Sequence, residues 1–417
     1  MIDIWTRVYR AFDPLMPLKE ADLETLYAER NVSIASDISD SIRMSESAVK
    51  VVLTGQRGSG KTTELRRVTR ELKDEFFPAW LDVESRLDLF NINHLEVLIG
   101  TTVTMYKTAE EKGITLDTAS LDRITETIQK VTRKRNLSID LSAPKLLEMA
   151  VGTFKLGLNW ETAKDINVEP EVSDILAHIS ESVAQIQATT GYLPLWIVDG
   201  LDKVEFDMAK KIFAESSLLA RPPCPIIYTV PFALSHSPQF EIVKTVFSGD
   251  VCRELPNVLL FTREGERVED GFRFFEDLVA KRLQAAQAEG FIESQALRAL
   301  IQKSGGVVRE LIYLVRYGVQ EAKRRKIERI DLVSALAAID RFKKEKVRGL
   351  DSERLTLLCQ IYRDRPQVLP SEGIREEVRS ELQATLYILY YEDGGQWYWT
   401  HPVLEDFLEA QCPKKNQ

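Results

Sequence analysis

The chain has few of the residues that build metal sites or disulfide frameworks. Its 417 residues include only four cysteines and four histidines, and no C-x-x-C pair occurs. No His/Cys spacing fits a zinc site. So few cysteines in so long a chain are typical of a reduced, intracellular protein. We therefore expect free, buried thiols at Cys224, Cys252, Cys359 and Cys412.

Long apolar runs are also absent. No stretch approaches the roughly 18 uninterrupted apolar residues that a membrane-spanning helix needs. The N-terminus carries Asp3 and has no long apolar region, so we expect no signal peptide. There is no internal repeat and no low-complexity segment. These absences predict a soluble, cytoplasmic protein.

An excess of positive charge is missing as well. The 55 Lys and Arg residues are outnumbered by 64 Asp and Glu residues, which gives a net charge of −9. We therefore expect no general attraction to nucleic acid or anionic lipid, although a local basic face stays open. The hydrophobic share of 44% is ordinary for globular proteins. At roughly 150 residues per domain, the length predicts two to three domains.

Short apolar runs alternate with helical patterns over the first part of the chain. This alternation is typical of a parallel α/β sheet with helices on both faces. We expect strands at 48–54, 79–83, 193–199, 226–230 and 258–261. Beyond about residue 263 the patterns are almost entirely helical.

A glycine-rich turn follows the first predicted strand and precedes a helix. Residues 55–62, Gly-Gln-Arg-Gly-Ser-Gly-Lys-Thr, match the P-loop pattern G-x-x-x-x-G-K-[ST]. The glycines let backbone N–H groups point at phosphate oxygens, Lys61 can reach the β- and γ-phosphates, and Thr62 can bind Mg²⁺. The sequence therefore predicts an ATP site with Mg²⁺ formed by Gly55, Gly58, Ser59, Gly60, Lys61, Thr62 and Thr63.

An acid at the end of another strand should complete the magnesium site. Asp199 ends the apolar run 195–199 and is the predicted metal ligand. Asp202 and Glu205 are candidates for orienting or deprotonating the attacking water. The alternative for Asp202 is a helix N-cap, a position that aspartate favours.

The stretch Asp199-Gly-Leu-Asp202 resembles the Walker B signature of the STAND ATPases, particularly the NACHT and KAP-like groups, within the wider AAA+ assemblage. Those families place an acid directly after the first or the second aspartate. This chain has Gly200 and Lys203 there. The resemblance thus implies an ATPase and leaves open both the catalytic base and how slowly ATP is hydrolysed.

Three further residues resemble AAA+ motifs. Thr229 lies at the sensor-1 position, and the alternative is an ordinary strand-end threonine. Arg309, after Ser304-Gly-Gly, is similar to the sensor-2 arginine of origin-recognition-type ATPases, which reaches the nucleotide from the lid. The alternative is an exposed helix residue. Arg253 falls where many AAA+ proteins place an arginine finger for a neighbouring subunit, although a surface salt bridge is the commoner fate.

These motifs predict the domain organisation. The fold class is α/β: a parallel P-loop NTPase sheet with a helical lid and a C-terminal winged-helix-like domain. We expect an N-terminal lead segment at 1–45, a P-loop ATPase core at 46–262 with a helical insert at about 107–175, a lid at 263–348, and the winged-helix-like domain at 349–417.

The resemblance implies an ATP-driven switch that controls partner proteins. STAND proteins usually carry C-terminal repeats as sensors, and none is present here. A separate protein would then supply the sensor or effector, in a multi-component system of the kind that includes antiviral defence. Formation of a homo-oligomer on ATP binding is expected if Arg253 acts on a neighbouring subunit.

A second interpretation is an initiator- or transposition-type ATPase that acts on DNA. Residues 321–348 hold ten Lys and Arg against five acids, with a compact basic run at Lys323, Arg324, Arg325 and Lys326. One feature argues against action on DNA: the expected recognition helix at 374–382 carries three glutamates, which DNA phosphates would repel. A third interpretation, a P-loop small-molecule kinase, ranks last because a lid and a winged helix would be unusual additions.

The aromatic run Trp397-Tyr-Trp399 has two interpretations. With Gly394 and Gly395 beside it, it could form a partner-docking edge. The alternation of side chains along a strand favours the second interpretation, in which both tryptophans face the core of the wing.

Overall fold

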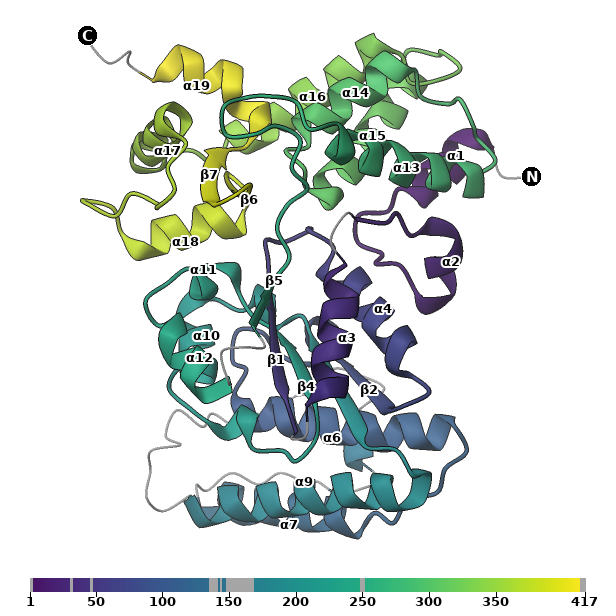
Figure 1. Cartoon of the computed structure of the whole chain (residues 1–417), viewed down its shortest axis with the longest axis vertical. Coiled ribbons are helices and arrows are strands. Elements are labelled where there is room, and N and C mark those ends of the chain that lie inside the picture. Colours follow the sequence, from purple (N-terminus) through teal and green to yellow (C-terminus); the bar gives the residue numbers. More distant parts are fainter. Residues whose placement is uncertain are drawn as a thin grey trace. The chain divides into compact units, whose positions relative to one another are not determined.

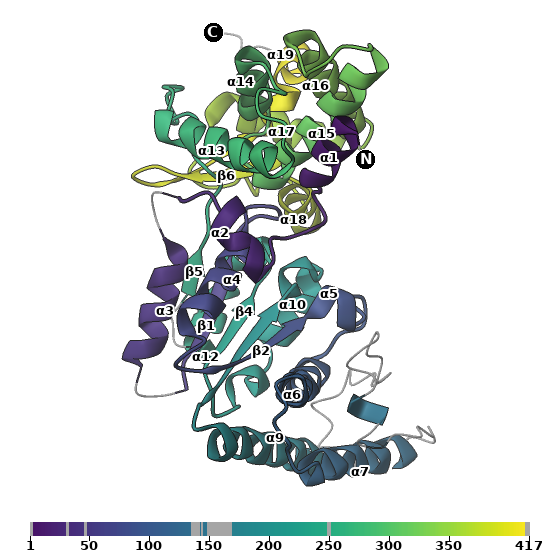
Figure 2. The ribbon, with the colours of Figure 1, turned by 90° about the vertical axis from the view of Figure 1, so that its right-hand side faces the viewer.

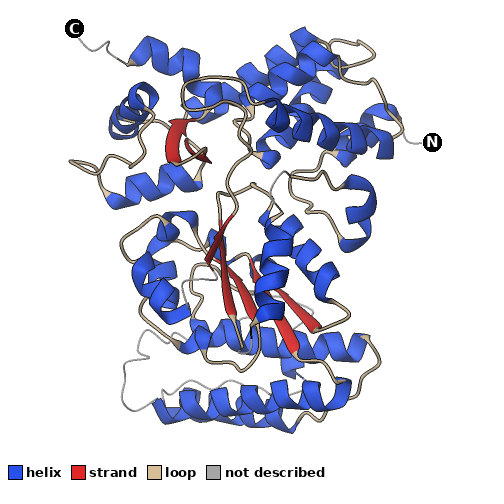
Figure 3. Cartoon of the chain, viewed as in Figure 1, coloured by secondary structure: helices blue, strands red, loops and turns tan. Residues whose placement is uncertain are grey.

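The computed structural model describes residues 3–30, 33–45, 48–134, 142, 145–147, 169–247 and 252–412 (Figures 1 and 3). The chain forms two compact units. The sheet unit comprises residues 35–54 and 68–254, and the helical unit comprises residues 1–34, 55–67 and 255–417. None of the described helices is both long and apolar enough to cross a membrane.

The sheet unit is built on five parallel strands in the order β2-β3-β4-β1-β5. Every residue of β1, β3 and β4 is buried, as expected for strands covered on both faces. The predicted parallel α/β sheet is therefore confirmed. The strands are β1 (Lys50–Thr54), β2 (Phe77–Asp82), β3 (Pro194–Asp199), β4 (Ile226–Thr229) and β5 (Cys252–Glu254).

The position predicted for the fifth strand was wrong. The strand that pairs with β1 is Cys252–Glu254, and residues 258–261 lie outside the sheet. The Val258 N–H donates to Gly306 O at 3.0 Å, and Phe261 forms an isolated bridge with Arg267. A short apolar run marks burial, and periodicity alone does not distinguish a strand from another buried segment.

Helices cover both faces of this sheet. In Figure 2, α3 (Ile34–Met44) lies on one side and α6 (His94–Glu111) on the other. The helices α7 (Ala119–Lys134) and α9 (Glu169–Thr190) pack together. Helix α7 and the start of α9 fall in the predicted insert, of which residues 135–141, 143–144 and 148–168 lie outside the described part. The shorter helices are α5 (Val83–Arg86), η2 (Leu201–Lys203), α10 (Phe206–Phe213), η3 (Leu218–Ala220), α11 (Phe232–Ser235) and α12 (Phe240–Phe247).

The helical unit contains a bundle around α15, whose apolar face buries Leu311, Leu314 and Val315. Gly318 of α15 lets Ile330 approach, since a Cβ there would lie 3.2 Å from the isoleucine. The helices are α1 (Ile4–Ala11), η1 (Glu20–Asp22), α2 (Leu23–Leu26), α13 (Glu269–Ala285), α14 (Ser294–Lys303), α15 (Val308–Arg324) and α16 (Leu332–Val347). Helix α4 (Lys61–Leu72) starts in this unit and ends in the sheet unit.

The C-terminal part has the winged-helix-like order of two helices followed by an antiparallel hairpin. Trp397 and Trp399 are buried in one cluster with Val307, Leu389 and Tyr391. They are core residues and not an exposed docking edge. The elements are α17 (Ser352–Asp364), α18 (Glu376–Ala384), β6 (Ile388–Glu392), β7 (Gln396–Thr400), η5 (Pro402–Leu404) and α19 (Glu405–Gln411).

The expectation of four free thiols was wrong. Cys359 on α17 and Cys412, after α19, form a disulfide across 53 positions of sequence. Cys224 and Cys252 are free, and burial raises the pKa of the Cys224 thiol to about 12. The spacing of the two bonded cysteines carries no local signal, because α17 and α19 come together only through the tertiary fold.

Reduction of this disulfide should destabilise the C-terminal part. Closing a loop of this size contributes about 4 kcal/mol in the chain-entropy model. We expect a reducing agent to lower the urea midpoint of the wild type and to leave a Cys359→Ser/Cys412→Ser variant unaffected. Cys252→Ser should keep the response to reductant. A wild-type midpoint that does not change with reductant would contradict the bond.

Candidate functional site

The P-loop joins β1 to α4 and curls through three glycines with positive φ. The values are +146° at Gly55, +82° at Gly58 and +111° at Gly60, a region that side chains disfavour. A Cβ at Gly55 would lie 2.5 Å from Leu255 O. The Thr63 N–H donates to Gly60 O at 2.9 Å, so the helix begins where the loop ends. This strand–loop–helix geometry is what phosphate binding requires.

Lys61 is buried and is held inside the loop. Its Nζ donates to Gly55 O at 2.7 Å and to Gln56 O at 3.1 Å. The ammonium group is therefore fixed at the loop by two carbonyl oxygens of the same loop. Its placement fits the predicted role at the β- and γ-phosphates of a nucleotide.

The start of α15 contacts the P-loop directly. The Arg309 N–H donates to Gly58 O at 3.2 Å, and a Cβ at Gly58 would lie 2.6 Å from the Arg309 Cβ. The turn before α15 depends on Gly305 and Gly306, which have positive φ; a Cβ at Gly306 would lie 1.9 Å from Val258 O. The structure thus brings the predicted sensor-2 arginine to the P-loop.

The N-terminal segment also contacts the P-loop, which sequence reasoning did not find. The guanidinium of Arg30 donates to Ser59 O and, at 3.1 Å, to Pro256 O. It lies 5.3 Å from the centre of the Phe274 ring. Burial lowers the pKa of Arg30, while Glu64 opposes that shift. No local pattern identifies Arg30, because its partners are far away in sequence.

A second contact joins the same segment to the first turns of α4. Tyr27 donates its hydroxyl to Glu64 Oε1 at 3.0 Å, and Arg67 donates to the same hydroxyl at 2.6 Å. The Arg67 guanidinium also lies 4.6 Å from the centre of the Tyr27 ring. Burial, followed by the charge of Glu64, raises the pKa of Tyr27 to about 12. The start of α4 is therefore fixed by an aromatic and two charged groups.

The predicted acids lie in the sheet unit. Asp199 ends β3 and is 8% exposed, and Gly200 follows with φ +100°. The Gly200 N–H donates to the Thr229 hydroxyl at 2.9 Å, and that hydroxyl lies 3.4 Å from Val198 O. The structure therefore brings Thr229 to the Asp199 turn, where its hydroxyl supports the backbone.

Asp202 lies in the short helix η2 and is as buried as Asp199. The N-cap of η2 is Gly200, and the N-cap of α10 is Glu205. Asp202 is therefore not the helix N-cap that the alternative interpretation proposed. The next residue, Lys203, forms an ion pair with Glu84.

Arg253, the candidate arginine finger, lies on β5 and contacts α3 of the same chain. It forms an ion pair with Asp37, and its Nη2 donates to Ser41 Oγ at 2.9 Å. The side chain is 22% exposed. A role toward a neighbouring subunit stays a prediction.

The strand directions place these residues at one edge of the sheet. Leu53 of β1 is opposite Thr229 of β4, and Val198 of β3 is opposite Tyr228. Because the strands are parallel, β1, β3 and β4 end at the same edge. In the sheet unit, Thr54, Asp199 and Thr229 mark this edge, and the P-loop follows Thr54 directly in the sequence.

The predicted magnesium ligands, Thr62 and Asp199, belong to different units, and the magnesium site stays a prediction that rests on their chemistry. Among the described residues, no group of three or more His, Cys, Asp and Glu side chains could hold a metal by itself. Mg²⁺ usually takes one or two protein ligands and completes its shell with phosphate and water. The hydroxyl of Thr62 and the carboxylate of Asp199 are oxygen donors of the kind that Mg²⁺ takes. A zinc site, or a calcium site made only of protein ligands, would need a larger group of ligating side chains than the described residues contain.

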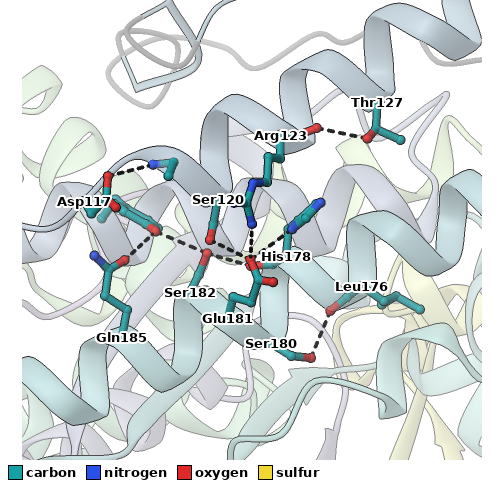
Figure 4. Close-up of polar contacts among 12 residues, drawn as sticks. Asp117, Ser120, Arg123, Thr127, Leu176, His178, Ser180, Glu181, Ser182 and Gln185 are labelled. Carbon is teal, nitrogen blue, oxygen red and sulfur yellow. Dashed lines mark hydrogen bonds and ion pairs between the residues drawn. The ribbon is translucent and has the colours of Figure 1, made fainter.

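Outside these motifs, a polar cluster lies between α7 and α9 (Figure 4). Glu181 of α9 accepts from Ser120 at 3.1 Å and from Arg123 at 3.3 Å, both on α7, and His178 Nδ1 lies 3.0 Å from the same oxygen. The contact with His178 is the main cause of the lowered pKa of Glu181. The cluster connects α7 to α9.

A parallel sheet in which a glycine-rich loop joins a strand to a helix, with an acid at the end of a second strand, is the P-loop NTPase fold. No protein-family model and no curated protein matches the chain. Solved structures with a similar fold include the ORC2 protein of Aeropyrum pernix (10% identity, 96% of this chain and 98% of that chain, TM-score 0.45). A second is the ORC1 protein of Aeropyrum pernix in complex with DNA (14% identity, 98% of this chain and 96% of that chain, TM-score 0.40). A third is the Holliday junction branch migration motor RuvB of Thermotoga maritima (12% identity, 89% of this chain and 92% of that chain, TM-score 0.38). Similarity this low says nothing of activity.

Replacing Thr229 tests whether its hydroxyl supports the backbone of the Asp199 turn. Thr229→Val leaves the buried Gly200 N–H without its acceptor, which should cost about 1–3 kcal/mol in the free energy of unfolding. Thr229→Ser keeps the hydroxyl and should cost less. Urea unfolding of both variants measures this difference. Equal stability of the valine variant and the wild type would show that the hydroxyl does not support the turn.

Proposed function

We propose that the protein is an ATPase in which the P-loop binds the triphosphate of ATP. The observation that supports this best is the loop itself, with three positive-φ glycines before α4 and Lys61 held at its centre. Thr62 and Asp199 would bind Mg²⁺, which neutralises charge on the β- and γ-phosphates. Asp202 or Glu205 would orient the attacking water.

The chain's own groups contribute mainly position and charge. In phosphoryl transfer, catalysis comes almost entirely from placing the reactants and stabilising negative charge. Lys61 supplies a buried positive charge, and the P-loop and the start of α4 supply N–H groups. Arg309, at the first turn of α15, would add a second positive charge from the lid. Thr229 would hold the turn that carries Asp199.

Removal of the lysine charge should abolish this activity. Lys61→Ala should lower ATP turnover by about 10²-fold or more, the scale for losing one preorganised charge donor. Lys73→Ala, an exposed lysine just after α4, is the matched control and should turn over ATP like the wild type. Phosphate release in steady state is the measurement. Unchanged turnover in the Lys61 variant would refute the proposed ATPase.

We infer that the ATPase acts as a switch on other proteins. Support comes from the contact of Arg309 with Gly58, through which a change in the P-loop can reach the lid helix α15. A separate sensor or effector protein, formation of a homo-oligomer through Arg253, and a setting in antiviral defence stay predictions from the sequence resemblance.

A second candidate function is action on DNA. All four residues of the basic run 323–326, at the end of α15, are exposed. Two of them are paired within the chain: Arg324 with Glu321 at 2.6 Å and Arg325 with Asp331 at 2.6 Å. Lys323 and Lys326 are thus the better candidates for phosphate contacts. Helix α18 is a poor one, because its first turn carries Glu376 and Glu377.

Charge reversal at those two lysines tests this candidate. If DNA is bound there, a Lys323→Glu/Lys326→Glu variant should bind duplex DNA more weakly, whatever the base sequence of the DNA. The slope of log K against log salt should fall by about 2, near one unit per phosphate contact. Lys73→Glu/Lys211→Glu, which makes the same change in net charge at two other exposed lysines, is the control. Fluorescence anisotropy over a salt series measures both quantities, and an unchanged slope would remove the DNA interpretation.

A further inference from the structure

The side chain of Gln56, the second residue of the P-loop motif, binds the C-terminal hairpin. Its Nε2 donates to Ile388 O at 2.7 Å and to Gln383 O at 3.3 Å. Its Oε1 accepts from the Tyr390 N–H at 2.8 Å. The amide thus bonds the backbone of β6 at two points two residues apart, as a neighbouring strand would.

Asn257 completes this contact. Its Nδ2 donates to Gln56 Oε1 at 2.6 Å and to Tyr390 O at 3.2 Å. Both side chains are buried, at 2% and 4% exposed. Two side-chain amides from outside the hairpin therefore satisfy the N–H and C=O of Tyr390 and the C=O of Ile388, groups that would be costly to leave unpaired.

The edge of β6 explains why such a contact can form. Strands β6 and β7 form a sheet of two strands, so β7 pairs with only one edge of β6. The other edge presents backbone groups that need partners. Gln56 and Asn257 supply them, and the P-loop is in this way attached to the hairpin.

The same residue is bonded to the lysine that would bind phosphate. Gln56 O accepts from Lys61 Nζ at 3.1 Å, while the Gln56 side chain bonds β6. A phosphate that drew Lys61 away from this carbonyl would change the bonding of the Gln56 peptide. Because the side chain is anchored at both ends of its amide, a movement of that peptide acts on β6.

We propose that Gln56 is a positioning residue that couples nucleotide binding at the P-loop to the C-terminal hairpin; the proposal rests on the proposed ATP binding. The hairpin holds the P-loop through Gln56. Bound nucleotide changes the hydrogen bonds that Gln56 makes with the edge of β6 that is not paired with β7. Coupling of this kind is reciprocal. The factor by which ATP binding changes the stability of the hairpin contact is therefore also the factor by which loss of that contact changes ATP affinity. Coupled sites typically change each other's affinity by roughly 5–150-fold.

Hydrogen exchange tests the coupling in the full-length protein. MgATP binding to the wild type should alter exchange of the Tyr390 amide, followed in peptides that cover 388–400. Gln56→Leu should lose this response and change ATP affinity by about fivefold or more. Gln396→Leu is the matched control: this glutamine lies on β7, and its side chain donates to Gln367 O, which is not a P-loop residue. It should keep both the response and the affinity.

The outcomes distinguish the coupling from ATP binding itself. A wild type that binds MgATP without any change in β6 exchange overturns the coupling, as does a Gln56→Leu variant with normal affinity and response. A wild type that binds no MgATP refutes the proposed function and the coupling with it. If Gln56→Leu does not fold, Asn257→Ala loosens the same contact without changing the P-loop, and it should weaken the response in the same direction.

Discussion

The approach of other segments to the P-loop backbone is the constraint on which the helical unit depends. Glycine at position 58 lets the Arg309 N–H reach Gly58 O, and glycine at position 55 lets the loop pass Leu255 O. A side chain at either position would separate these backbones. These contacts therefore depend on the same glycines that the P-loop pattern contains, because only a backbone without side chains admits so close an approach.

This arrangement gives each part of the helical unit its own contact with the P-loop. Arg30 reaches it from the N-terminal segment, Arg309 from the lid and the hairpin through Gln56. Each contact uses a main-chain carbonyl or a side chain of the loop. On the proposed function, a nucleotide that changed the loop would act on three segments at once, whereas the Asp199 turn in the sheet unit is supported separately by Thr229.

The sequence predicted those features that local patterns determine. The P-loop glycines, the acid at the end of β3 and the buried tryptophans of β7 follow from spacing and alternation, and the parallel sheet follows from its apolar runs. The fifth strand was misplaced because residues 258–261 form a short apolar run outside the sheet, in which Leu260 is buried and Phe261 makes an isolated bridge with Arg267. Arg30, Gln56 and the pair Cys359–Cys412 were missed because their partners are brought together only by tertiary folding.

Titration of MgATP into the full-length protein, with hydrogen exchange followed along the chain, tests the central claim most directly. The account predicts saturable binding together with increased protection of the P-loop amides at 55–63 and of the first turn of α15. MgATP binding that leaves the exchange of the α15 amides unchanged would contradict the claim that the contact between the P-loop and α15 transmits the effect of the nucleotide. Absence of any binding would contradict the assignment of the P-loop as an ATP site.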